Sequence, residues 1–211
     1  MLAASKVMGA GGAGGGGTNE FVEYASGGGT VTLSAAPQAG DLLVLHTGAY
    51  AFANTQDSAF TEVVYKQSSP WSGSYIETSR IGYKIATGSE GTTISTLSGG
   101  FEISSLLAVY RFSSSVVGVS VAFAASQQGT ASRSIDILNY AKPNVVVCSV
   151  GSYEDPNMSM TDQNYSFRQS HLDAASSLTD VGSTTYTSVI TATGANFNEA
   201  CTYAVLVPIL A

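Results

Sequence analysis

The chain has 211 residues, of which 44% are hydrophobic and only 11% are charged, and its formal net charge is −7. This length suits one moderately sized domain or two small ones, and the hydrophobic content excludes an intrinsically disordered chain. The Lys and Arg residues stand singly, and the apolar runs are shorter than the roughly 18 residues of a membrane helix, so we expect neither a nucleic-acid nor a membrane partner.

Residues 1–20 form a glycine-dense segment. The stretch "MGAGGAGGGGT" (8–18) contains the pattern Gly-x-Gly-x-x-Gly. A dinucleotide-binding loop needs a strand before it and a helix after it, and the flanking glycines exclude both, so we expect no cofactor.

Two interpretations of this segment remain, a flexible tail and an arm that packs against a neighbouring subunit. Ordering such residues costs about 1 kcal/mol or more each, which only a substantial interface offsets. We expect the arm, with partner contacts at Gly9, Gly11, Gly12, Gly14, Gly15, Gly16 and Gly17.

From residue 21 the chain changes to short β-like runs separated by Gly, Ser, Pro and Asn. The runs "DLLVLHTGAY" (41–50) and "SLLAVYRFS" (105–113) begin with continuous apolar residues, which is typical of strands buried on both faces. Alternating runs predict further strands at 21–25, 29–35, 60–67, 74–86 and 92–99. The stretch "TGSEG" (87–91) predicts a hairpin turn between strands 80–86 and 92–97.

The second half has the same texture. Only "HLDAASSLTDVG" (171–182) is a candidate for a helical turn or two. The fold expected is all-β, an antiparallel jelly-roll-like β-sandwich over residues 21–211 that follows the arm at 1–20. The predicted strands here are 116–124, 132–138, 144–150, 164–169, 184–192 and 201–209.

The sequence contains one internal echo. "DLLVLHTGAY" (41–50) and "NVVVCSVGSY" (144–153) align without gaps. Two related halves, about 21–113 and 114–211, would produce this echo, and so would the limited vocabulary of β-rich sequences. Both explanations stay open. The identical pairs are Val44/Val147, Gly48/Gly151 and Tyr50/Tyr153.

The chain offers few residues for catalysis. His46 ends a buried-type strand and is expected to be a hydrogen-bonded interior residue, and His171 beside Asp173 is expected in a solvated loop. No Gly-x-Ser-x-Gly elbow is present, so no hydrolase nucleophile is indicated and we expect no enzymatic activity. Cys148 and Cys201 do not make a disulfide framework, and two reduced thiols are favoured over a bridge.

Two loops carry residues that bind ligands in other proteins. "EDPNMSMTD" (154–162) holds Glu154, Asp155, Asn157 and Asp162, which suit calcium, but the EF-hand pattern is absent and we expect no metal. "SSPWSGSY" (68–75) holds Trp71 and Tyr75, which form a glycan-contact loop if they face solvent. The alternative is that Trp71 closes one end of the core.

The segments "AAPQAGDLLVLHTG", "RIGYKIATGSEGTTISTLSGG" and "SLLAVYRF" resemble virion proteins of tailed bacteriophages, in particular jelly-roll or β-sandwich proteins of capsid decorations, tail fibres and spikes. The resemblance covers about residues 35–113 and departs at Trp71, where Pro and Gly would be expected before the tryptophan. The matching positions are Ala39-Gly40-Asp41, Trp71, Tyr83-Lys84-Ile85-Ala86 with Glu90, and Tyr110-Arg111.

The resemblance implies a structural, non-enzymatic protein of the virion, made in the host cytoplasm. Its partners would be major capsid or tail proteins and further copies of itself, as a homo-oligomer. A capsid decoration or cement protein is expected, with the arm and the apolar C-terminal strand "YAVLVPIL" engaging neighbours. The alternatives are a phage tail fibre or receptor-binding protein, and a secreted carbohydrate-binding module, for which the N-terminus shows no export signal.

Overall fold

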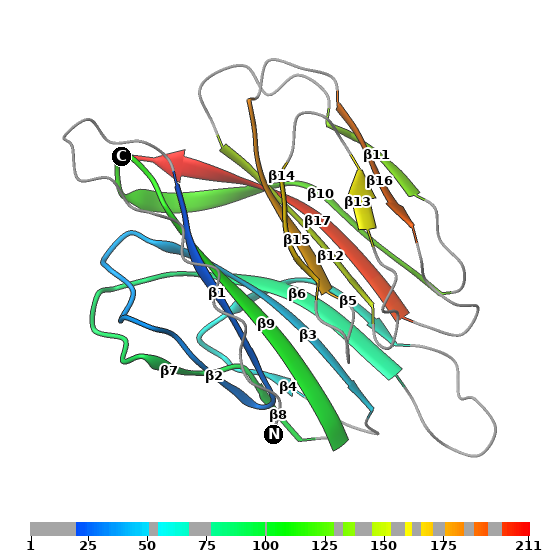
Figure 1. The fold of residues 1–211 in the computed structure, drawn as a ribbon, viewed down its shortest axis with the longest axis horizontal. Coiled ribbons are helices and arrows are strands. Elements are labelled where there is room, and N and C mark those ends of the chain that lie inside the picture. The colour runs from blue at the N-terminus through cyan, green and yellow to red at the C-terminus, as the bar shows by residue number, and fades with distance from the viewer. Residues whose placement is uncertain are drawn as a thin grey trace.

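A computed structural model describes the chain in segments that together contain only β-strands and their connections (Figure 1). Every strand pair among them is antiparallel. These residues include no helix of the length and apolarity that crossing a membrane requires. The described segments are 20–50, 55–67, 77–99, 101–128, 133–137, 145–152, 159–161, 166–170, 176–183, 188–193 and 200–211.

The first half of the chain builds a five-stranded sheet around its two most apolar runs. Leu42–Leu45 and Leu106–Ala108 are fully buried, as expected for strands covered on both faces. In spatial order the strands are β1 (Glu20–Gly27), β9 (Phe101–Arg111), β3 (Leu42–Tyr50), β6 (Glu77–Ile85) and β5 (Thr61–Gln67).

Two short ribbons cover one face of this sheet. Strand β2 (Thr30–Thr32) pairs with β7 (Thr93–Ser95), and β4 (Thr55–Gln56) pairs with β8 (Leu97–Ser98). Val31 and Ile94 from the first ribbon, with Phe60 nearby, pack against Leu43, Leu45, Leu107 and Val109 of the sheet. The first half therefore encloses a hydrophobic core of its own.

The second half repeats this plan. Its five-stranded sheet has a three-stranded companion sheet of β11 (Arg133–Ile137), β16 (Ser188–Thr193) and β13 (Ser159–Thr161). In spatial order the strands of the larger sheet are β10 (Val116–Gln128), β17 (Ala200–Leu210), β12 (Val145–Ser152), β15 (Ser176–Ser183) and β14 (Ser166–Ser170).

The two halves have the same strand order. Counted within its own half, each large sheet runs from the first strand to the last, then the third, and ends on a hairpin of two later strands. In the small sheet of the second half, β16 pairs with both β11 and β13. In the first half the corresponding pairings are made in two separate ribbons, where β7 pairs with β2 and β8 pairs with β4. The two segments of the sequence echo form β3 and β12, the middle strands of the two large sheets.

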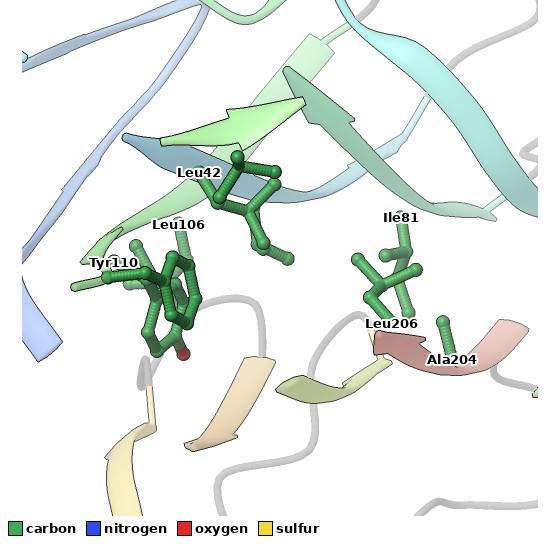
Figure 2. Packing of buried hydrophobic residues seen from close by; sticks show 10 residues of the cluster. Leu42, Ile81, Leu106, Tyr110, Ala204 and Leu206 are labelled. Atoms are coloured by element: carbon green, nitrogen blue, oxygen red, sulfur yellow. The ribbon is translucent and has the colours of Figure 1, made fainter. Parts of the chain in front are cut away.

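A second core lies between the two large sheets. Leu42, Ile81, Leu106 and Tyr110 of the first sheet face Ala204 and Leu206 of β17, and all six are fully buried (Figure 2). Burial of one such leucine or isoleucine stabilises the fold by about 1.5–3 kcal/mol. This core joins the halves because each half contributes one wall.

Two sequence predictions are wrong in detail. The helical turn proposed at 171–182 is contradicted from Ser176 onward, because that segment forms β15 between β12 and β14. Hydrogen bonding on both sides overrides the local helix preference of "AASSL". The turn at 87–91 exists but joins no hairpin, because β6 pairs with β3 and β5 while β7 pairs with β2.

Candidate functional site

The described residues that carry the virion resemblance lie at one end of the first sheet, and Trp71 lies outside the described residues. Asp41 precedes β3 and Arg111 ends β9, and their side chains form a two-point ion pair. The Arg111 Nε–H donates to Asp41 Oδ1 at 2.9 Å, and Nη2 donates to Oδ2 at 2.7 Å. The Gln38 N–H also donates to Oδ2, at 2.7 Å. Asp41 is 2% exposed, so this pair closes the core at that end.

Gly40 makes this closure possible. Its φ is +86°, a backbone conformation that favours glycine, and an added Cβ would lie 2.9 Å from Ser115 Cα. The Val116 N–H donates to the Gly40 carbonyl at 3.1 Å, which ties the start of β10 to the start of β3. A polar hollow of about 210 Å³ is lined by residues 38–41 and 111–115. It is smaller than typical ligand pockets, and the residues that line it already hydrogen-bond to one another.

The third matching segment, around Lys84 and Glu90, forms a turn held by one carboxylate. The Glu90 side chain is 6% exposed, and Lys84 Nζ lies 2.9 Å from its Oε1. The Thr87 N–H donates to Oε1 and the Gly88 N–H donates to Oε2. Burial alone would raise the pKa of Glu90, but these hydrogen bonds outweigh it and lower that pKa from 4.5 to about 2. The described residues that carry the resemblance therefore bond to one another and to the backbone, and they stabilise the fold.

His46 lies in the interior, as the sequence analysis expected. Its Nε2 lies 3.0 Å from Ser79 Oγ, and that oxygen lies 2.7 Å from Thr202 Oγ1. All three residues are fully buried. A histidine beside a serine is part of a nucleophilic pair in some enzymes, but solvent does not reach Ser79 here. The chain of hydrogen bonds instead ties β3 and β6 to β17 across the core between the sheets.

The register of the second sheet separates the two cysteines. Cys148 on β12 stands opposite Val205, and Cys201 on β17 stands opposite Ser152. The two positions are four residues apart along the ladder, which corresponds to about 13 Å. A disulfide needs Cα atoms about 4.4–6.8 Å apart, so the two cysteines do not bridge.

The described surface has an apolar margin on the second sheet. Val117 is 61% exposed and Val121 is 44% exposed, both on β10, and Ile209 on the adjacent β17 is 50% exposed. We call these three residues the β10 patch. The sequence singled out neither valine, but Ile209 lies in the C-terminal strand "YAVLVPIL" that was expected to engage neighbours. Composition identifies apolar strands, but which of their side chains are exposed depends on which strand lies at the edge of the sheet.

The other sequence-predicted site residues lie outside the described residues. These are the glycines of the arm, the loop of Trp71 and Tyr75, the acidic loop at 154–162 apart from Ser159–Thr161, and His171 with Asp173. Among the residues that the structure does describe, no group of three His, Cys, Asp or Glu side chains could hold a metal ion. The arm and the glycan-contact loop remain predictions from the sequence.

Comparison with known proteins adds no relative. No family model, no curated protein and no solved structure matches the chain. The fold, the site geometry and the sequence resemblance are therefore the observations that bear on function.

Proposed function

We propose that this chain is a non-enzymatic structural protein of a phage particle, specifically a capsid decoration or cement protein. The observation that carries the proposal is the structural role of the residues in the virion-like motifs. Asp41 with Arg111, and Lys84 with Glu90, form buried or half-buried ion pairs at the same end of the first sheet. Motif residues that form such ion pairs stabilise a rigid protein body, and such a body would act through contacts on its surface.

The finer fold that we propose is a jelly-roll-like β-sandwich present twice. An eight-stranded jelly roll places its first, last, third and sixth strands in one sheet and its second, seventh, fourth and fifth strands in the facing sheet. The orders β10-β17-β12-β15 and β11-β16-β13 fit that plan, and β1-β9-β3-β6 with its two ribbons fits it in the first half. The departure is the fifth strand of each half, β5 or β14, which pairs with the sixth at the edge of the large sheet. This architecture is common in capsid proteins, and it also occurs in lectins, so it supports a virion role by analogy.

The glycine-rich segment fits the same role as an arm that engages neighbours. Glu20, the first described residue, lies on β1, the outermost strand of the first sheet, and stands opposite Arg111 of β9 in the strand register. Glu20 lies at the end of the first sheet where the Asp41–Arg111 pair and the start of β10 also lie, which supports contacts of a preceding arm with neighbours at that end. Deletion of residues 1–17 is expected to leave the fold intact and to abolish incorporation into the particle.

The copy number of the chain in purified particles tests the proposal. Quantitative mass spectrometry against the major capsid protein would give hundreds of copies for a decoration or cement protein. A few to a few tens of copies would overturn the capsid assignment in favour of a tail fibre or receptor-binding protein. Absence from the particle would overturn the virion role and favour the alternative function, a carbohydrate-binding module, which a glycan array then tests.

A further inference from the structure

The two large sheets end in four edge strands, and one of them differs from the rest. β1 carries Glu20 and Glu23, β5 carries Glu62 and Lys66, and β14 carries Arg168. β10 has no charged residue over its 13 positions. Charged side chains on an edge strand discourage pairing with a further strand, so β10 alone lacks this protection.

Bulges do not explain the difference. The register shifts once in the pairings of β1, β5 and β14, and twice in the pairing of β10. A bulge twists an edge away from partners, but all four edges share that feature. The absence of charge is what separates β10 from the other three.

The β10 patch enlarges this uncharged margin. Ile209 lies across Gly118, because a Cβ added there would be 3.4 Å from Ile209 Cδ1. β17, which pairs with β10 along its length, also contains no charged residue. Exposed valine and isoleucine gain free energy when they are covered, at about 25 cal/mol per Å² of apolar surface. The margin thus combines an unprotected edge with apolar side chains ready for burial.

We propose that β10 is a dimer interface, which pairs antiparallel with β10 of a second copy of this chain. A second copy brings the same net charge of −7, and the repulsion between two copies is weak where neither surface carries charge. The margin of β10 and β17 is such a surface. An antiparallel pair of identical strands has two-fold symmetry, and it would join two sheets into one. This inference rests on the assembly role proposed above and names the surface that serves it.

Matched lysine substitutions on two equivalent edges test the interface. S120K places a charge on an exposed position of β10, and S26K places the same charge on an exposed position of β1, the corresponding strand of the other sheet. V117K is a second interface variant, at the most exposed valine. Mass is measured by sedimentation equilibrium of the full chain over a range of concentrations, and thermal unfolding of each variant verifies its fold.

Wild type and S26K are expected at twice the 21.6 kDa of one chain. S120K and V117K are expected to raise the dimer dissociation constant about tenfold or more, because a lysine would be buried without a partner. The wild-type dimer should also tighten between about 0.05 M and about 0.5 M salt, because screening relieves the repulsion between two acidic copies. An interface built from ion pairs would weaken instead.

Three results would overturn the inference: a wild-type mass of one chain throughout, equal weakening by S26K and S120K, or a dimer that neither S120K nor V117K affects. If wild type is monomeric, and S120K but not S26K fails to enter the particle, the edge takes a strand of another virion protein. That result overturns the second copy and leaves the proposed function standing. If the wild-type chain forms the dimer but is absent from particles, the dimer interface stands and the proposed function is overturned.

Discussion

At the scale of the residue, Glu90 shows how one carboxylate fixes a turn. Its pKa of about 2 lies below the ordinary 4.5, so its ionised form favours the folded state. The stability that it contributes is complete above about pH 4.5 and is lost as the pH falls through about 2. E90Q removes the charge, so we expect it to lower the free energy of unfolding by about 2 kcal/mol at neutral pH.

Urea denaturation of wild type and E90Q at several pH values measures this contribution. The difference between the two proteins should shrink from pH 4.5 downward and nearly vanish near pH 2. E62Q is the control, because Glu62 also forms an ion pair, with Arg80, but its side chain is 39% exposed. Its cost should stay below about 1 kcal/mol. A pH-independent difference for E90Q would contradict the assigned role of the carboxylate.

At the scale of the element, most strands were predictable from the sequence because their pattern is local. Alternation and apolar runs located β3, β9, β10 and β17 to within a few residues. The short strands β4 and β13 were not predicted, because two or three residues are too few to show an alternating pattern. β15 was misjudged because its environment, not its composition, makes it a strand.

The contacts between elements were not predictable. Asp41 and Arg111 are 70 positions apart, and nothing in the sequence indicates which carboxylate meets which arginine. The resemblance brought both residues to attention without indicating that they touch. The β10 patch was hidden for the same reason, because exposure depends on which strand lies at the edge of the sheet.

The Asp41–Arg111 pair joins the start of β3 to the end of β9, and R111M tests what that connection contributes. The substitution leaves Asp41 buried without its cation, so the free energy of unfolding should fall by about 3 kcal/mol. D41N combined with R111M should recover part of that loss, because the uncompensated charge is gone. Guanidinium unfolding of both single variants and the double variant measures the coupling. Additive losses would show that the pair is not coupled.

At the scale of the whole molecule, two cores with different roles follow from the repeated strand order. One core lies inside the first half, between its large sheet and its ribbons. The other lies between the two large sheets and draws on both halves. The His46–Ser79–Thr202 chain crosses the same boundary. We therefore expect the halves to depend on each other for stability although each has a complete set of strands.

A cut between Ser113 and Ser114, in the connection from β9 to β10, tests that dependence. Residues 1–113 alone would expose the inner wall that Leu42, Ile81 and Leu106 form, and should be insoluble or self-associated. Co-expressed with 114–211, they should copurify as a soluble one-to-one complex, because the shared core re-forms.

Substitutions in the 114–211 fragment locate the interaction. L206D places a charge in the shared core and should abolish copurification, whereas V117K lies on the exposed margin of β10 and should leave it unchanged. A soluble monomer of residues 1–113 would contradict the dependence. It would mean that the core between the sheets is a contact between two independent domains rather than part of one folding unit.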